Sequence, residues 1–214
     1  MRQFIIAVSS VVALFLGASA GAADVVEGRD FTTVRPKQAT DDPSKIVVTE
    51  FFSYQCPHCY AFSRSLAEWI AKLPADVICR REAVSIGHAS WEPIARTFYA
   101  LDALGKLPTL DATIFNAIHE KRMILNTEDA IANWLATNGV TANKFKATYR
   151  SFGVDVKWQR GQQMAAAHRI PSVPVIAIDG KYLVEIVGNI DFAKQLGNVD
   201  ALIKMVRVER AAKK

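Results

Sequence analysis

The chain is poor in cysteine, which limits the kinds of site and stabilisation it can have. Three cysteines occur in 214 residues, and two of them, Cys56 and Cys59, lie two residues apart. A short exported domain stabilised by disulfides has an even, dispersed set of cysteines. One Cys-x-x-Cys loop is too short to cross-link distant elements. A chain of this length with 50% hydrophobic residues can bury a core without such bonds. The pair therefore needs another explanation.

Metal and haem sites are also poorly supported. A structural zinc site needs four ligands, and the chain has no second Cys-x-x-Cys and no pair of histidines at zinc-finger spacing. Covalent haem attachment requires a histidine directly after the second cysteine, where this chain has Tyr60. We therefore expect no metal and no cofactor other than a redox-active Cys56–Cys59 disulfide.

The chain lacks a basic block and a long apolar run. Its net charge of +5 is spread along the sequence without interleaved aromatic residues, so we expect no nucleic-acid binding. Arg2 is followed by the apolar stretch FIIAVSSVVALFLG and then by ASAGAA. This run is shorter than the roughly 20 residues that a spanning helix needs. We interpret residues 1–22 as a cleavable signal peptide, cut after Ala20 or Ala22, and a retained membrane anchor is the alternative.

The remaining pattern predicts an α/β fold interrupted by helices. KIVVTEFF (residues 45–52) has the composition of a buried strand, PHCYAFSRSLAEWIAKL that of a helix ending before Pro74, and VICRREAV (77–84) that of a second strand. A hairpin follows much later, with strands at 175–178 and 182–187 around Asp179-Gly180. An amphipathic helix that begins at Asp200 and carries Leu202, Met205 and Val206 is predicted to end the fold.

Between residues 91 and 167 the periodicity is helical. We expect helices to begin after Ser90, Thr127 and Thr141, the last one bearing Phe145, Tyr149 and Phe152. The predicted organisation has three parts after the signal peptide. Residues 23–85 and 166–214 form the two parts of one α/β domain, and residues 86–165 form an inserted helical domain.

The position of the cysteine pair indicates chemistry. If the helix begins at Pro57, where a missing N–H has no cost, Cys56 becomes its N-cap. The sulfur of Cys56 can then accept hydrogen bonds from the N–H groups of His58 and Cys59 at the positive end of the helix dipole. Both effects favour the thiolate, which is the nucleophile in disulfide exchange. Cys59 lies one turn further inside and is expected to act as the resolving thiol.

His58 is placed to add to this effect. Its imidazole provides a donor or a positive charge near Cys56, and either one stabilises the thiolate. A more stable reduced thiolate makes the disulfide easier to reduce and hence more oxidising toward other thiols. The alternative is that His58 is an exposed turn residue without influence.

The stretch EFFSYQCPHCYAF after the strand IVVT resembles the active site of DsbA-like proteins of the thioredoxin superfamily. The segment SVPVIAIDGKY is similar to the one that follows the helical insertion in that family. The resemblance implies a thioredoxin fold with an inserted helical domain and a depressed thiol pKa. It also implies a cis peptide bond before Pro174 that places Val173 opposite the cysteines to bind substrate. Without the resemblance, Pro174 reads as an ordinary trans proline that begins an edge strand, and Pro171 is a competing candidate for the cis position.

Two further residues attract attention. Glu50 interrupts a buried strand, and a buried carboxylate must be paired or protonated. The resemblance implies that Glu50 helps to move the proton of Cys59 and has a basic partner at Arg81. An arginine cannot release its proton, so we expect Arg81 to hold Glu50 ionised. A solvent-facing Glu50 is the alternative. Cys79, on a strand among apolar residues, is interpreted as a small core residue rather than a third redox thiol.

The predicted function is that of a periplasmic thiol:disulfide oxidoreductase that forms a mixed disulfide with its substrate at Cys56. The resemblance implies folding exported proteins with free cysteines as substrates, and reoxidation by a membrane protein resembling DsbB. We expect a monomer. A disulfide isomerase or reductase is the second possibility, but Val173 stands where isomerases usually have threonine. A non-catalytic chaperone that uses the same groove is the third.

Overall fold

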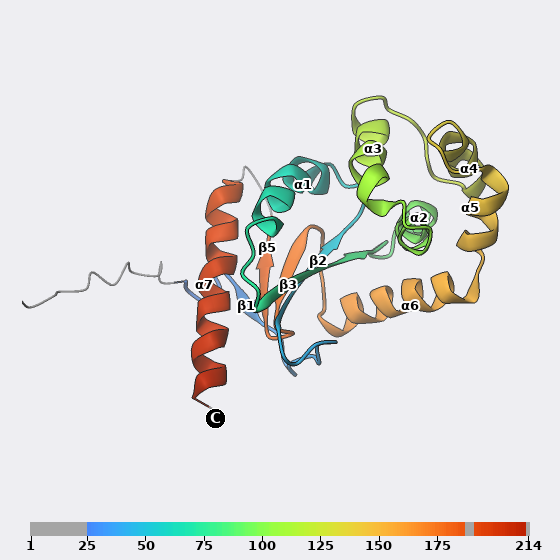
Figure 1. The fold of residues 1–214 in the computed structure, drawn as a ribbon. Coiled ribbons are helices and arrows are strands. Elements are labelled where there is room, and N and C mark those ends of the chain that lie inside the picture. Colours follow the sequence, from blue (N-terminus) through green and yellow to red (C-terminus); the bar gives the residue numbers. More distant parts are fainter. Residues whose placement is uncertain (1–24, 187–190, 213–214) are drawn as a thin grey trace, which may run out of the picture.

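A computed structural model of the chain describes residues 25–186 and 191–212 (Figure 1). The segment predicted as a signal peptide lies outside these residues. Five strands form one mixed sheet in the order β1-β5-β4-β2-β3. Their bounds are β1 Thr32–Thr33, β2 Ile46–Phe52, β3 Val77–Ala83, β4 Val175–Ile178 and β5 Tyr182–Glu185.

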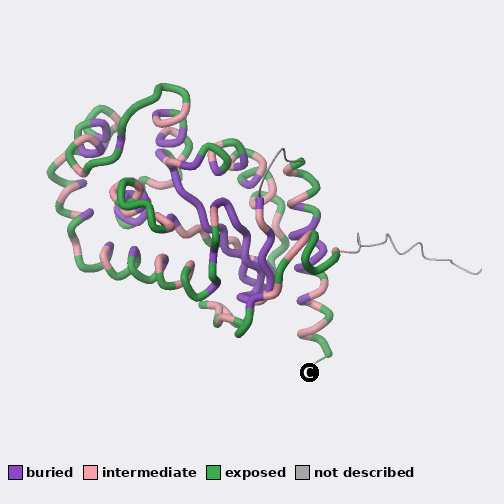
Figure 2. Tube along the Cα trace, turned by 180° about the vertical axis from the view of Figure 1, so that it is seen from behind, coloured by how far each residue is buried: buried purple, intermediate pink, exposed green. Residues whose placement is uncertain are grey.

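The strand before the cysteine pair lies deep in the molecule. All seven residues of β2 are buried, because strands flank it on both sides and an apolar cluster covers each of its faces. β3 pairs with β2 in parallel, and β4 pairs with it antiparallel. The predicted strands at 45–52 and 77–84 are thus confirmed to within one residue at their ends. Figure 2 shows β2 in the buried centre of the fold with β4 and β5, whereas most residues of the edge strand β3 are only partly buried.

The hairpin is confirmed in place and differs in length. Asp179 and Gly180 adopt positive φ angles of 54° and 64° and form the turn, closed by a hydrogen bond from the Lys181 N–H to the Ile178 carbonyl at 2.9 Å. β5 ends at Glu185, short of the predicted Val187, which is outside the described residues. The two-residue strand β1, which pairs with β5, was not predicted.

Seven α-helices and one 3₁₀ helix are described. Five of the α-helices, α2 to α6, lie between β3 and β4 in the chain and gather on one side of the molecule. α7 lies on the other side, and α1 lies between them, in contact with both α7 and α3 (Figure 1). The bounds are α1 Pro57–Ile70, η1 Ala89–Trp91, α2 Glu92–Ala103, α3 Leu107–His119, α4 Glu128–Ala136, α5 Ala142–Tyr149, α6 Phe152–Ala167 and α7 Phe192–Ala211.

The predicted helix starts had mixed outcomes. Thr127 caps α4 by accepting the Ala130 N–H at 3.2 Å, and Thr141 is the N-cap residue of α5, as predicted. Ser90 is not a cap, because it lies inside η1 and α2 begins after Trp91.

Two helix assignments near the C-terminal half were wrong. Phe152 does not extend the apolar face of α5; it begins α6 and is 82% exposed. The last helix starts at Phe192 rather than Asp200, because the Asp191 side chain accepts the Lys194 N–H at 3.1 Å and opens the helix earlier. Leu202 and Val206 are buried as expected, while Met205 is partly buried.

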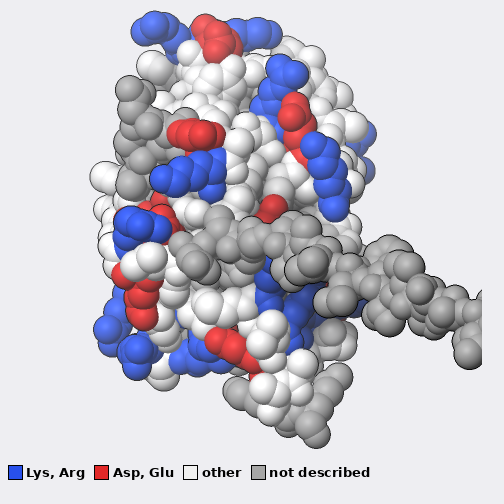
Figure 3. Space-filling view, turned by 90° about the vertical axis from the view of Figure 1, so that its left-hand side faces the viewer, with Lys and Arg blue, Asp and Glu red and all other residues white. Residues whose placement is uncertain are grey.

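The sheet separates two apolar clusters. One joins α1 and α7 to the sheet around Val48, Phe62 and Leu202. The other contains Cys56 and Cys59 and extends into helices α2 to α6. On the face that carries α7, Lys and Arg side chains are intermingled with Asp and Glu (Figure 3). Within the described ranges, no helix is long and apolar enough to cross a membrane.

Candidate active site

The cysteine pair lies in the turn between β2 and α1. Pro57 is the first residue of α1, and Cys56 is its N-cap with extended φ and ψ angles of −83° and 119°. The Cys56 carbonyl accepts the Tyr60 N–H at 3.1 Å, which is the first hydrogen bond of the helix. The predicted placement of Cys56 and Pro57 is therefore confirmed. Proline favours this start because its fixed φ suits a helix and it has no N–H to satisfy.

The two sulfurs differ in burial and surroundings. Both cysteines are reduced, and Cys59 is fully buried while Cys56 retains 5% of its surface. The Ser53 N–H donates to the Cys59 sulfur at 3.5 Å. As predicted, Cys59 is the inner thiol and Cys56 the outer one.

The surroundings of Cys56 favour its thiolate and lower the pKa of Cys56 to about 6. The largest cause is a hydrogen bond from the Cys59 thiol, and the backbone N–H groups of Cys59 and His58 and the charge of the His58 ring add to it against the cost of burial. The sulfur makes no well-aligned cap hydrogen bond, so the first-turn amides contribute mainly through their dipoles. The amides of His58 and Cys59 lower the pKa of Cys56 as predicted, and the neighbouring Cys59 thiol, whose effect was not predicted, lowers it more.

The other two cysteines shift in the opposite direction. Burial raises the pKa of Cys59 far above its ordinary value, and its hydrogen bond to Cys56 and the charge of Glu50 add to this. Burial also raises the pKa of Cys79 to about 12. Cys79 is half-buried at the margin of the α1–α7 cluster, which agrees with its interpretation as a packing residue. Of the three thiols, only Cys56 has a lowered pKa.

The segment before β4 closes over Cys56. The Val173–Pro174 peptide bond is cis, and Pro171 is not in a cis bond. The Cys56 thiol donates to the Val173 carbonyl at 3.3 Å. This contact belongs to the protonated form, because a thiolate has no hydrogen to donate. Val173 thus meets the reactive sulfur from far along the chain.

Glu50 and Arg81 pair beneath the turn as predicted. The two residues are directly opposite in the β2–β3 register, and Arg81 Nε donates to Glu50 Oε2 at 2.6 Å. Glu50 is 1% exposed, so it does not face solvent. Arg81 favours the ionised carboxylate as expected, but burial has the larger effect on the pKa of Glu50. Burial raises the pKa of Glu50, and Arg81 only partly offsets that shift.

Three residues that the motif did not single out complete this region. The Tyr54 hydroxyl, fully buried, donates to Asp111 Oδ1 at 2.5 Å, and Arg81 Nη1 donates to Asp111 Oδ2 at 2.8 Å. His119 Nε2 donates to the Tyr54 carbonyl at 2.8 Å, and its ring stacks on Tyr60. Asp111 precedes the buried Ile114 and Phe115 at helical spacing. An acidic residue on an otherwise apolar helix face was the sequence signal that could have identified Asp111.

A hollow with a mixed lining adjoins the active-site turn. Its polar side is formed by Gln55, which precedes Cys56, and by Ser90, Arg122 and Asn126, and its apolar side by Trp91, Ile118, Met123 and Ile124. Ile124 is 76% exposed and Met123 37% exposed. These two apolar side chains therefore remain in contact with solvent near the cysteine pair.

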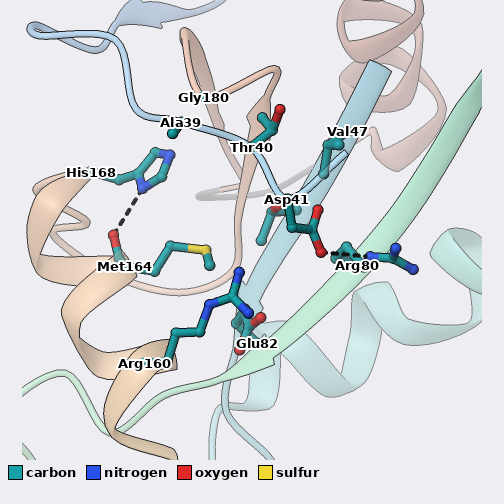
Figure 4. A pocket seen from close by; sticks show the side chains of 11 residues that line it. Ala39, Thr40, Asp41, Val47, Arg80, Glu82, Arg160, Met164, His168 and Gly180 are labelled. Carbon is teal, nitrogen blue, oxygen red and sulfur yellow. Dashed lines mark hydrogen bonds and ion pairs between the residues drawn. The ribbon is translucent and has the colours of Figure 1, made fainter. Parts of the chain in front are cut away.

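A separate cavity lies between the sheet and α6, away from the cysteine pair. Its lining includes Thr49, Glu82, Arg160 and His168, and neither Cys56 nor Cys59 (Figure 4). The Arg80–Asp41 ion pair borders it, and His168 is held by the Met164 carbonyl. Among residues 25–186 and 191–212, no cluster of three His, Cys, Asp or Glu side chains is arranged to hold a metal ion.

Comparisons with known proteins identify similar chains. The thioredoxin family model matches residues 41–198. The chain is 33% identical to the thiol:disulfide interchange protein DsbA of Pseudomonas aeruginosa over 87% of this chain and 88% of the relative. It is 35% identical to DsbA of Bordetella parapertussis over 84% and 85%, respectively.

Solved structures agree with the sequence relatives. The crystal structure of Pseudomonas aeruginosa DsbA superimposes with a TM-score of 0.82 at 33% identity, covering 90% of this chain and 99% of that one. The structure of oxidoreductase DsbA from Xylella fastidiosa gives a TM-score of 0.79 at 32% identity, with 86% and 98% covered. The residues matched by the family model include β2 to β5, the helices between β3 and β4, and the cysteine pair.

Proposed function

The chain belongs to the DsbA family of thiol:disulfide oxidoreductases, and we propose that it acts as a periplasmic dithiol oxidase for newly exported proteins. In this role the Cys56–Cys59 disulfide is donated to a substrate through a mixed disulfide at Cys56. The disulfide itself is the only redox group that the reaction requires.

The contrast between the two sulfurs is the observation that carries the proposal. Cys56 is the outer sulfur and has a pKa of about 6, whereas burial keeps the pKa of Cys59 far above its ordinary value. A stable Cys56 thiolate is a good leaving group when a substrate disulfide forms. A pair with these properties gives up its disulfide readily, which favours oxidation of the substrate over reduction.

The proposed reaction has two exchange steps. A substrate thiolate attacks the Cys56 sulfur, the Cys56–Cys59 bond breaks, and Cys59 leaves with the bonding electron pair and takes up a proton. A second substrate thiolate then attacks the substrate sulfur of the mixed disulfide, and Cys56 leaves as a thiolate. The substrate loses two electrons and two protons. The enzyme pair gains the two electrons, Cys59 ends with one proton, and the other proton is released to solvent.

Glu50 and the Val173–Pro174 segment have supporting roles in this scheme. Glu50 is buried, its pKa is raised by that burial, and its charge is felt by Cys59. A carboxyl that keeps its proton more readily than usual is suited to supply one to the departing Cys59 thiolate. The Val173 carbonyl touches the Cys56 sulfur, so the same segment can bind the extended backbone of a substrate in the mixed disulfide.

Substrates and partners follow from the surface beside the turn. The exposed Met123 and Ile124 favour segments that still expose apolar residues, as folding exported proteins do. The reduced pair must be reoxidised, and we propose a membrane protein resembling DsbB for this step. Residues 1–22 are proposed to direct export and to be removed, which N-terminal sequencing of the secreted protein would test.

The experiment that tests the function is oxidation of a peptide with two thiols by the purified oxidised protein. We expect Cys56→Ser to abolish turnover, because no mixed disulfide can form. Cys79→Ser is the matched control and should retain full activity, since that thiol lies outside the pair. Turnover that survives in Cys56→Ser would contradict the proposed mechanism, whereas a non-catalytic chaperone would leave the peptide unoxidised even with the wild-type protein.

The glutathione redox equilibrium of the pair separates oxidase from reductase. We expect the disulfide to be reduced by glutathione far more readily than that of thioredoxin, because the Cys56 thiolate stabilises the reduced form. A potential as reducing as that of thioredoxin would contradict the proposed direction of the reaction.

A further inference from the structure

One guanidinium is shared between two carboxylates beneath the active-site turn. Arg81 donates from Nε to Glu50 at 2.6 Å and from Nη1 to Asp111 at 2.8 Å. The side chains of Glu50, Arg81 and Asp111 are 1%, 19% and 24% exposed, so solvent screens them only in part. One positive charge therefore compensates two negative ones in a largely buried place.

The shared geometry is held from several directions. The Arg81 guanidinium lies over the Phe52 ring, 4.1 Å from its centroid, and its plane limits where each carboxylate can bind. The Tyr54 hydroxyl donates to the second Asp111 oxygen at 2.5 Å. Asp111 is thus kept in place by two donors, and Arg81 cannot turn fully toward Glu50 without losing Asp111.

We propose that Asp111, on α3, is a positioning residue that divides the charge of Arg81 and thereby keeps Glu50 able to hold the proton it exchanges with Cys59. The inference rests on the proposed function, in which Glu50 serves as the proton donor to Cys59. It assigns to a residue of the predicted helical insertion an influence on the thiol chemistry of the β2–α1 turn.

All charged and titratable groups that act on Glu50 are consistent with this assignment. From β3, Arg81 favours ionised Glu50. From α3, the charge of Asp111 opposes its ionisation and raises the pKa of Glu50, in addition to the larger effect of burial. The thiols of Cys59 and Cys79 and the Tyr54 hydroxyl also face Glu50, and its charge raises the pKa of each of them beyond the larger effect of burial. Asp111 thus acts on both Arg81 and Glu50 with its negative charge.

Removal of the Asp111 charge leaves Arg81 and Glu50 as a simple ion pair. In Asp111→Asn the amide can still accept from Tyr54 or Arg81, so the shape is kept while the charge is lost. Arg81 then compensates Glu50 alone, and Glu50 ionises at lower pH. A smaller fraction of Glu50 is then protonated when Cys59 departs. The first exchange step should therefore slow over the pH range in which its rate depends on the protonation of Glu50.

The first measurement is the single-turnover rate of mixed-disulfide formation with a peptide thiol, followed against pH in acid-quenched samples. We expect the Glu50-dependent limb of Asp111→Asn to move to lower pH. At a fixed pH on that limb the rate should fall roughly three- to tenfold, since each pKa unit changes the protonated-to-ionised ratio tenfold.

A second measurement tests the proposal independently of catalysis. The ¹³C resonance of the Glu50 carboxyl, titrated in the reduced protein, should show a lower midpoint in Asp111→Asn than in the wild type. Tyr54→Phe keeps the Asp111 charge and should leave the Glu50 midpoint close to the wild-type one. Asp102→Asn, which removes a surface carboxylate paired with Lys157 at 2.7 Å, should not move it either.

The outcomes separate this inference from the proposed function. An unchanged Glu50 midpoint in Asp111→Asn, or an equal shift in Asp102→Asn, would overturn the role of Asp111. Retained dithiol oxidation in Cys56→Ser would overturn the proposed function instead, and the carboxyl titration would still report whether Asp111 acts on Glu50.

Discussion

At the scale of single residues, the pKa values of Cys56 and Cys59 differ because each thiol acts on the other, and because their surroundings differ. The Cys59 thiol donates to the Cys56 sulfur, which stabilises negative charge on Cys56 and keeps the proton on Cys59. Burial acts in the same direction on Cys59, which has no exposed surface. A small difference in depth between two neighbouring side chains thus decides which sulfur is the nucleophile.

This difference predicts how the reduced protein reacts with iodoacetamide. Alkylation should occur at Cys56, with a rate that rises through a midpoint near pH 6, and Cys59 should stay unmodified. His58→Gln should move the midpoint upward, because the ring charge is lost while the His58 N–H remains. Mass spectrometry of samples quenched at a series of pH values measures both effects.

The matched control is His88→Gln, which removes an imidazole that packs against Trp91 rather than one next to Cys56. Its midpoint should equal that of the wild type. If His58→Gln also leaves the midpoint unchanged, His58 is an exposed turn residue without influence on the thiolate.

The residues of the site were predictable to the extent that they are close in sequence. Cys56, Pro57, His58 and Cys59 form one motif, and the strand before it indicated the helix cap. Asp111 could not be assigned a role, because only the packing of α3 brings it to Arg81. The direction of the pKa shift of Glu50 was also not predicted. The sequence pattern indicated Arg81 as a partner but not how strongly burial would oppose its effect.

At the scale of elements, the hairpin turn depends on a glycine for two independent reasons. Gly180 has a φ of +64°, and a Cβ added there would lie 2.1 Å from the Gln38 carbonyl oxygen. The Gln38 N–H in turn donates to the Gly180 carbonyl at 2.8 Å, so the two segments cannot separate without losing that bond. The turn holds β4, and β4 follows directly after Pro174.

We therefore expect Gly180→Ala to lower the free energy of unfolding by at least about 1–2 kcal/mol, the usual cost of a left-handed backbone for a residue with a Cβ. Gly197→Ala in α7 is the control, because its Cβ meets nothing within 4 Å and helix propensity should add about 0.5–1 kcal/mol. Urea unfolding of the reduced proteins measures both. Equal stabilities of the two variants would contradict the account of the turn.

Elements were predicted where one local signal was decisive. The apolar run of β2, Pro57 at the start of α1 and Asp179-Gly180 in the hairpin each indicated one structure. Ser90 failed as a cap because a 3₁₀ turn replaces the expected helix start, and α7 begins earlier because Asp191 is also a competent N-cap. Polar residues that can cap are frequent, and only packing selects among them.

At the scale of the whole molecule, the cysteine pair belongs to the apolar cluster that joins the sheet to helices α2 to α6. A change in charge at Cys56 therefore contributes to the stability of the whole fold. The direction follows from comparing the folded and unfolded thiol. The folded pKa of about 6 lies below the ordinary value near 9, so between these pH values the unfolded chain binds a proton that the folded one lacks.

The free energy of unfolding of the reduced protein should accordingly rise with pH across this window. The contribution is fully present above the unfolded pKa and is lost as the pH falls through about 6. Other groups also titrate, so the measured quantity is the difference in urea unfolding between reduced wild type and reduced Cys56→Ser at each pH. This difference should grow from about pH 6 to about pH 9.

Cys59 does not obscure the comparison, because its raised pKa keeps it protonated in the folded state and both proteins contain it. The oxidised wild type provides a second reference, since it has neither thiol of the pair and should not show the extra slope. Parallel pH curves for reduced wild type and reduced Cys56→Ser would mean that the folded protein does not stabilise the thiolate. In that case a stabilised Cys56 thiolate would not favour the reduced state of the pair. If the disulfide were still oxidising, another interaction would have to explain it.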